Sequence, residues 1–371
     1  MYRPSLKSGW SLILLSVLAV VVYLIASHSF VEIKGSNYQE KLAAAELMQN
    51  YLDTLQQEIG DRGIEIDPIN DPFNTGLIGR RLSSITTDRG LLSEKQAAIN
   101  PNIAAIFVDE LSRAKKGDKI AVGITGSNPA VNLALYAALS VLELDPAIIV
   151  SLSSASYGAN REELTWLDME AILKEKGLLG FGADYASIGG SEDLGIGMSD
   201  NGIAMLRSAM QRNDVPLLMG GSLEENVELH MAAYNELLGE GNRYRLFVNI
   251  GGGIANVGSG TNARLIPEGL NTKLAERNFE KEGVMMKMAK NNVPVLHVRR
   301  ILRWARDYKL NLSLDQKPVA GEGNVFSSTI HNVTVASICL AVLLLAIIAV
   351  IIFDRHDRHF MANIVDPDEE L

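Results

Sequence analysis

Two long uncharged runs lie near the two ends of this 371-residue chain. Residues 12–26 are almost entirely apolar and reach about 20 residues when 27–30 are added, and residues 333–353 carry no charge. A helix of about 20 apolar residues crosses a bilayer. The pattern predicts one transmembrane helix within residues 1–30, a second over 331–353, and a short solvated cytoplasmic tail over 354–371. A cleaved signal peptide is the alternative for the first run, but residues 27–29 form a poor cleavage site.

The charges that flank these runs predict a topology. Arg3 and Lys7 precede the first run, and Arg355 and Arg358 follow the second. Since basic residues favour the cytoplasmic side of a membrane, both termini are expected in the cytoplasm and the central region outside it. The only cysteine, Cys339, lies in the second run. The outer domain is therefore expected to depend on core packing rather than on disulfides.

Between the two spans, the clearest pattern is an apolar strand, a turn and an apolar helix. Residues 119–125 are short and rich in β-branched side chains, residues 130–142 are nearly all apolar, and residues 146–152 form a second apolar run. Such a βαβ unit predicts a Rossmann-like, mostly parallel α/β sheet. The ligand edge of that sheet would carry Thr125, Gly126, Ser127 and Asn128, although a well-capped core helix explains the same residues.

The remaining pattern divides the central region in two. Residues 31–118 read as a helical, loop-rich stalk, with a helix-period stripe over 36–59. Residues 119–330 read as the α/β domain, with further strands over 215–219 and 244–250. The last of these runs directly into Gly251, Gly252 and Gly253. Three glycines after a buried strand allow the backbone to approach a ligand closely, or allow a helix to pack closely on the sheet.

Serines follow the second strand of the βαβ unit and supply candidates for catalysis. Ser153, Ser154 and Ser156 would lie at the ligand edge beside Ser127, and Asp168 follows in the next helix. Ser127, Ser154, Ser156 and Asp168 are the candidate catalytic residues. The chain has no G-x-S-x-G elbow. The sequence offers no reason to prefer His230 or His297 as the partner of a serine.

A Gly-rich acidic segment, residues 186–202, contains the weak candidates for a metal site: Glu192, Asp193 and Asp200. Surface loops collect the same residue types for backbone reasons. The sequence therefore leaves the metal, and any cofactor, unassigned.

A basic segment follows in a chain that is acidic as a whole. The formal net charge is −10, which argues against nucleic-acid binding, yet residues 284–309 hold seven Lys and Arg against one Asp. A basic helix with a solvated face explains this pattern. Contact with anionic lipid headgroups or with an anionic polymer are the functional alternatives. The candidate residues are Arg299, Arg300, Arg303, Arg306 and Lys309.

Long segments of the chain resemble a known family. They are TGSNPAVNLALYAAL, SLSSASYGANREELTWLDME, IGGSEDLGIGMSDNG and NIGGGIANVGSG, in that order between the two spans. Together they resemble the poly-gamma-glutamate system protein family. That resemblance implies a membrane component that accompanies the machinery making poly-γ-glutamate, an anionic exopolymer of bacterial capsules linked through side-chain carboxyls. It implies no reaction and no catalytic residues.

Three hypotheses follow from the residues and the resemblance together. The first is a component of the cytoplasmic membrane that assists polymer synthesis, handling or export through contacts with the polymer, the synthase complex and lipids. The second is an extracytoplasmic amide hydrolase or transferase acting on the polymer. The third is a scaffold for the synthase. The oligomeric state, a homo-oligomer included, stays open.

Overall fold

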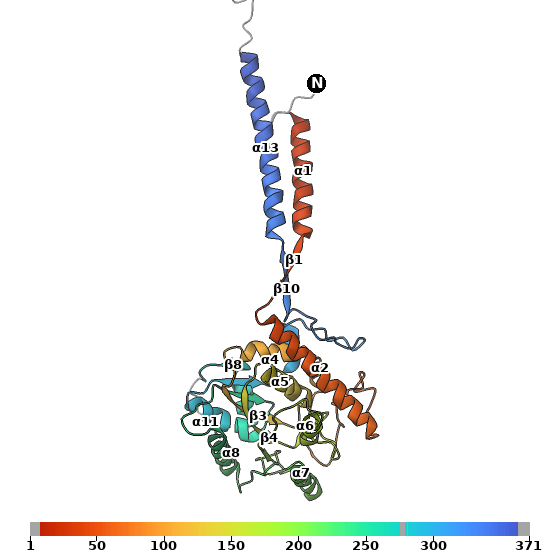
Figure 1. Ribbon diagram of the computed structural model, residues 1–371, viewed down its shortest axis with the longest axis vertical. Helices are drawn as coiled ribbons and strands as arrows, with labels where there is room; N and C mark the ends of the chain where they lie inside the picture. Colours follow the sequence, from red (N-terminus) through yellow and green to blue (C-terminus); the bar gives the residue numbers. More distant parts are fainter. Residues whose placement is uncertain (1–7, 275–278, 280, 363–371) are drawn as a thin grey trace, which may run out of the picture. The chain divides into compact units, whose positions relative to one another are not determined.

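The two ends of the chain meet in one structural unit. The structure is a computed structural model that describes residues 8–274, 279 and 281–362, and the chain divides into Met1–Lys34 with Ser327–Leu371 as one unit and Gly35–Phe326 as the other. In the first unit, helix α1 (Gly9–His28) packs beside helix α13 (Val333–Ala362) (Figure 1). Strand β1 (Phe30–Lys34) pairs antiparallel with β10 (Ser327–His331), with Phe30 opposite His331.

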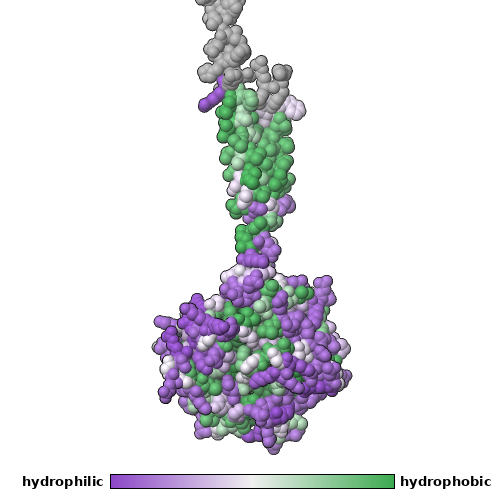
Figure 2. Space-filling model, in the orientation of Figure 1, coloured by the Kyte–Doolittle hydropathy of each residue, from purple (hydrophilic) through white to green (hydrophobic). Residues whose placement is uncertain are grey.

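Both helices of this unit are long and apolar enough to cross a membrane. The apolar spans are Gly9–His28, with 20 residues, and Val333–Arg355, with 23, and nearly all of their side chains are exposed. Figure 2 shows this surface as almost continuously hydrophobic. The unit therefore fits a two-pass membrane protein. Helix α13 continues to Ala362, so the first part of the predicted tail is helical, and residues 363–371 lie outside the described residues.

The second unit, called the domain below, is built on a six-stranded sheet. Its strand order is β6-β4-β3-β7-β9-β8, and all neighbours are parallel except the edge strand β8. The strands are β3 (Lys119–Thr125), β4 (Asp145–Ser151), β6 (Tyr185–Ser187), β7 (Leu246–Ile250), β8 (Gly269–Asn271) and β9 (Val295–Val298). A short parallel pair, β2 (Thr86–Asp88) with β5 (Ser154–Ala155), lies outside this sheet. The α/β class with a mostly parallel sheet is thus confirmed.

Alternate residues of each strand enter two separate cores. Ile120 and Val122 belong to one buried cluster, whereas Ala121 between them belongs to the other. The same alternation separates Val248 from Phe247. Because successive side chains of a strand point to opposite faces, the sheet is covered on both faces. This double burial explains why the strands read as continuous apolar runs.

Helices supply the rest of both cores. The larger cluster includes residues of α2 (Tyr38–Asp61), α3 (Leu92–Ala98), α4 (Ile103–Leu111), α5 (Pro129–Val141), α6 (Trp166–Glu175), α7 (Asp200–Arg212) and α12 (Ile301–Asp307). The smaller cluster includes residues of α8 (Leu223–Leu238), α9 (Ile254–Val257), α10 (Gly260–Leu265) and α11 (Val284–Lys290).

The segment expected to be a stalk is part of the domain. Helix α2 packs on α4 and α5, and its residues Ala44, Met48, Tyr51 and Leu55 are fully buried. The stripe that predicted this helix is therefore a core-facing surface. The boundary expected at residue 118 does not separate two units, since Gly35–Phe326 is one unit.

Three local expectations are corrected by the structure. Residues 215–219 form only a single bridge, at Leu217, and no strand. The helix expected to begin near Asn160 begins at Trp166, because Thr165 and Asp168 form its capping box. The basic segment is not one helix: α11, β9 and α12 follow each other within residues 284–309.

Candidate functional site

The strand order creates a switch point at the carboxyl end of β3. From β3 the chain continues to β4 on one side, whereas β7 occupies the other side of β3. The connections that follow β3 and β7 leave the sheet edge in different directions, so a crevice opens between the carboxyl ends of these strands. Ligands of open α/β sheets bind in such crevices. The residues predicted at the ligand edge, 125–128 and 251–253, follow these two strands.

The turns after β3 and β7 are in contact. A β-carbon added to Gly251 would lie 3.0 Å from Asn128 Nδ2 and 3.0 Å from Thr125 Oγ1. Gly251 also has a positive φ of 87°, which favours glycine. Gly252, by contrast, has open space around it. The structure therefore brings together both sets of predicted ligand-binding residues.

A buried lysine orients the turn after β3. Lys95, on α3, donates from Nζ to Ser127 O at 2.5 Å and to Asn128 Oδ1 at 2.6 Å. Burial lowers the pKa of Lys95 to about 8, against the opposing influence of Glu94. Because Lys95 holds the amide oxygen of Asn128, that side chain does not cap α5. The amide group of Asn128 is thereby fixed beside Gly251.

We call the cavity at this point the switch-point crevice. It is lined by Glu94, Asn128, Val131, Ile250, Val298, Arg299 and Ile301 and holds about 220 Å³ of empty space. Pockets for drug-sized ligands hold roughly 300–1,000 Å³. The crevice therefore has room for one small group, such as a single amino-acid unit, and too little for a large cofactor. Its lining includes Asn128 and Arg299, which the sequence analysis assigned to two different sites.

The other residues of the basic segment do not line this crevice. Arg300 pairs with Glu268 at 2.8 Å, and Arg303 lies 3.7 Å from Asp307. Arg306 and Lys309 are exposed. Lys287 and Lys290 pair with glutamates as well. The positive charge of the segment is thus largely balanced locally, and Arg299 is the member that reaches the crevice.

The candidate serines at the sheet edge stabilise the local structure. Ser127 Oγ accepts the N–H of Ala155 at 3.0 Å. Ser154 is fully buried and donates to Gly126 O at 3.1 Å, and Ser156 donates to Asp88 O at 3.4 Å. In the described part of the chain, none of the sheet-edge serines hydrogen-bonds a histidine. A serine–histidine pair is therefore not assembled here.

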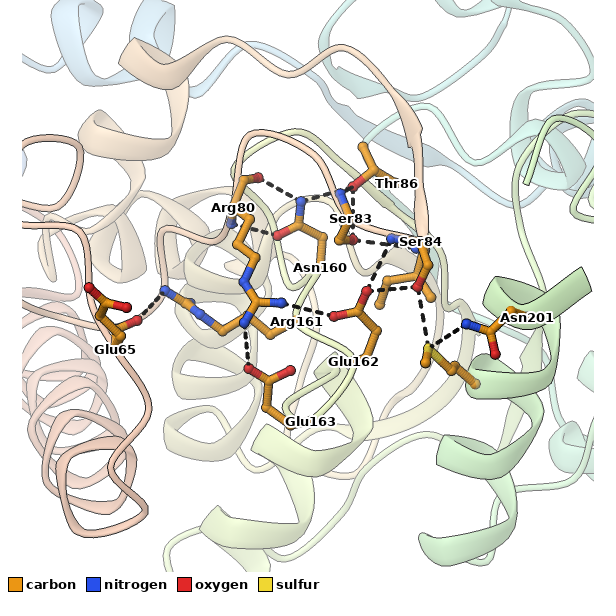
Figure 3. A network of polar contacts seen from close by, with 12 residues as sticks. Glu65, Arg80, Ser83, Ser84, Thr86, Asn160, Arg161, Glu162, Glu163 and Asn201 are labelled. Atoms are coloured by element: carbon orange, nitrogen blue, oxygen red, sulfur yellow. Dashed lines mark hydrogen bonds and ion pairs between the residues drawn. The ribbon is translucent and has the colours of Figure 1, made fainter. Parts of the chain in front are cut away.

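A polar network fastens a covering segment over these serines. Asn160 accepts from Arg80 N at 2.8 Å and donates to Arg80 O at 2.6 Å (Figure 3). The Arg80 guanidinium pairs with Glu162 and Glu163, and Glu162 also accepts from Ser84. The backbone of the same segment bonds Ser154 N and Ser156 N. These contacts explain why Asn160, expected to cap a helix, instead binds backbone groups.

Asp168 is held by neighbours of its own. It accepts from Thr165 N and Oγ1 and binds Arg212 through both carboxylate oxygens, at 2.7 and 2.5 Å. Burial pushes the pKa of Asp168 upward, but the bonds from Arg212, Asn213 and Thr165 outweigh burial and lower it. The charged carboxylate therefore stabilises the start of α6 rather than the crevice.

Asp168→Asn should accordingly lower stability and leave ligand binding unchanged. The pKa of Asp168 lies below its usual 3.8, so its contribution is complete above that value and is lost as the pH falls through the lowered pKa. We expect a loss of roughly 1–3 kcal/mol at neutral pH, which shrinks in acid. Denaturant unfolding of the full chain in detergent at several pH values measures this. A loss that is independent of pH would contradict it.

The acidic candidates separate in the structure. Asp193 is fully buried, accepts from Ser151 Oγ at 3.2 Å and Ser187 Oγ at 2.8 Å, and lies 3.3 Å from His230 Nε2. Glu192 is half-buried, 3.4 Å from Lys281, and Asp200 is exposed in the first turn of α7. Among the described residues, no three His, Cys, Asp or Glu side chains gather as a metal site would require.

The second domain histidine is also part of a buried network. His297 Nδ1 lies 3.0 Å from Asn249 Nδ2, and its Nε2 lies 3.1 Å from Ala263 O. A neutral ring protonated at Nε2 satisfies both bonds. Burial lowers the pKa of His297, which favours this neutral form. His297 therefore ties β9 to β7 and α10.

Comparison with known proteins adds no assignment to this geometry. No protein-family model, curated protein or solved structure matches the chain.

Sequence reasoning missed two residues of the site, Glu94 and Lys95. Both lie on α3, whose path past the switch point depends on the tertiary fold. The only local signal was a charged pair before an apolar stretch, and exposed helix surfaces have the same pattern.

Proposed function

We propose that this protein is a two-pass component of the cytoplasmic membrane in poly-γ-glutamate production, and that its extracytoplasmic domain holds the polymer at the switch-point crevice. The pathway rests on the resemblance of its long segments to the poly-gamma-glutamate system protein family. The sidedness rests on Arg3, Lys7, Arg355 and Arg358, which flank the spans.

One observation supports the crevice as the binding site: Asn128 and Arg299 line the same cavity. Each unit of poly-γ-glutamate carries a free α-carboxylate, because the chain is linked through the side-chain carboxyl. An arginine guanidinium binds a carboxylate through two parallel bonds, and a nearby amide adds a further donor. The buried ammonium of Lys95 lies behind Asn128 and adds positive potential.

The strand order supports the same placement. With the five parallel strands numbered along the chain, their spatial order is 3-2-1-4-5. This order agrees with a Rossmann-like arrangement, in which the crevice beside the first strand receives the ligand. We therefore take the domain as Rossmann-like, with a binding role for its switch point.

The comparison of two arginines tests this proposal. Arg299→Gln should weaken binding of poly-γ-glutamate to the full chain in lipid nanodiscs by about tenfold, since a hydrogen-bonded charge pair contributes roughly 1.5–3 kcal/mol. Arg306→Gln is the matched control because Arg306 is exposed and does not line the crevice. It should change the affinity by less than about twofold.

The measurement is fluorescence anisotropy with labelled polymer at physiological salt. Equal losses in both variants would indicate a diffuse basic surface rather than the crevice. No binding by the unmodified protein would overturn the proposed function. Polymer shortened during incubation would indicate the enzymatic alternative.

A further inference from the structure

The charged lining of the switch-point crevice is balanced. Glu94 and Arg299 are its two charged residues, one of each sign. Both are half-buried, and they come from α3 and from the residue after β9. A site for an inner unit of a polyanion needs no carboxylate. Near a protein surface, an additional carboxylate close to Glu94 would be repelled by several kcal/mol at an effective dielectric constant of about 20.

Both charged groups are fixed in place and keep bonding capacity. Glu94 Oε2 accepts the N–H of Leu302 at 2.8 Å, and within the described chain its other oxygen has no donor. Arg299 donates from one terminal nitrogen to Ala263 O at 2.9 Å, which leaves further N–H groups. Asn128 is oriented by Lys95. The crevice thus presents an acceptor of negative charge and donors of positive charge in a preorganised arrangement.

The rest of the lining is apolar. Val131, Ile250, Val298 and Ile301 complete the crevice. An aliphatic surface of this kind suits the methylene groups of a glutamyl side chain. The empty space of about 220 Å³ limits the occupant to about one amino-acid unit.

We infer that the switch-point crevice receives an α-amino acid head group, namely the amino-terminal unit of a poly-γ-glutamate chain. That unit alone in the polymer carries both a free α-ammonium and a free α-carboxylate. The ammonium would pair with Glu94 and the carboxylate with Arg299. An inner unit has only the carboxylate, because its nitrogen is in an amide bond. This inference rests on the proposed function and specifies which part of the polymer is bound.

The experiment uses the full chain in nanodiscs and short γ-linked glutamate oligomers of one length. The free-amine oligomer should bind at least about tenfold more tightly than its N-acetylated form. Glu94→Gln should remove this preference by weakening only the free-amine form. The variant keeps an oxygen that can accept from Leu302, so the start of α12 is retained. Free glutamate serves as a separate probe for a monomer site.

The outcomes separate the inference from the proposed function. Equal binding of both oligomers, with both weakened by Arg299→Gln, would overturn end recognition and leave polymer holding intact. Binding of neither oligomer and of no long polymer would overturn both. Tight binding of free glutamate with no binding of either oligomer would also overturn end recognition, because the site would then serve the monomer. A preference for the free amine that survives Glu94→Gln would show that Glu94 does not recognise the ammonium.

Discussion

Gly126→Ala should destabilise the domain by roughly 3 kcal/mol, at the upper end of the usual cost of overpacking a core. The added β-carbon would lie 2.5 Å from Leu152 O and 3.1 Å from Ser153 O. Both are backbone atoms, so no side-chain rotation relieves the clash. The turn after β3 would have to move away from the segment that follows β4.

That movement would also break the bonds that hold the turn. Gly126 N donates to Ser151 O at 3.0 Å, and Gly126 O accepts from Ala159 N at 2.8 Å and from Ser154 Oγ. Because the same turn carries Asn128, we expect loss of polymer binding together with the loss of stability. Denaturant unfolding of the full chain in detergent, followed by tryptophan fluorescence, measures the first effect.

Gly252→Ala is the matched control. Gly252 lies in the neighbouring turn but has open space around its α-carbon and no positive φ. Its substitution should leave the free energy of unfolding within about 0.5 kcal/mol. Equal unfolding midpoints for the two variants would refute the close approach of the two segments at Gly126.

The sequence predicted the parts of this domain whose residues face apolar surroundings on both sides. The βαβ unit over 119–152 was recognised because its strands and helix are buried in two cores and therefore have few polar positions. Ser222 was recognised as the cap of α8 from the capping-box spacing, and it accepts from Glu225 N. These signals are local in the chain.

The sequence did not predict features that depend on contacts between distant segments. Strand β9 has only four residues and is preceded by polar residues and followed by two arginines, so the basic pattern concealed it. Asp168 was read as a catalytic candidate, although its role depends on Arg212, which is 44 residues away. Likewise, the position of Lys95 at Asn128 requires α3 to pass the end of β3, which no periodicity encodes.

Lys95→Met should remove a rise in stability that the unmodified protein shows between about pH 8 and pH 10. Burial lowers the pKa of Lys95 from 10.5 to about 8. Between these two values the unfolded chain binds a proton at Lys95 that the folded chain has released. Stability therefore rises with pH across this window, by at most about 1.4 kcal/mol per pH unit. The total is on the order of 2 kcal/mol.

The upper limit of the window is set by buried tyrosines. Burial raises the pKa of Tyr136 and Tyr234 well above 10, so above that pH the folded state keeps protons that the unfolded state releases. Stability must then fall as the pH rises further. Lys116→Met is the control, because Lys116 is exposed and forms only a surface pair with Glu143. It should keep the rise in melting temperature that Lys95→Met abolishes.

The same substitution separates orientation from charge at the crevice. If Lys95 acts by holding Asn128 Oδ1, methionine frees that amide, and polymer binding weakens at every pH from 7 to 10. If Lys95 acts through its charge alone, the unmodified protein itself should lose affinity as the ammonium is deprotonated near pH 8. Binding measured at both ends of this range distinguishes the two. A variant that binds like the unmodified protein throughout would exclude Lys95 from either role.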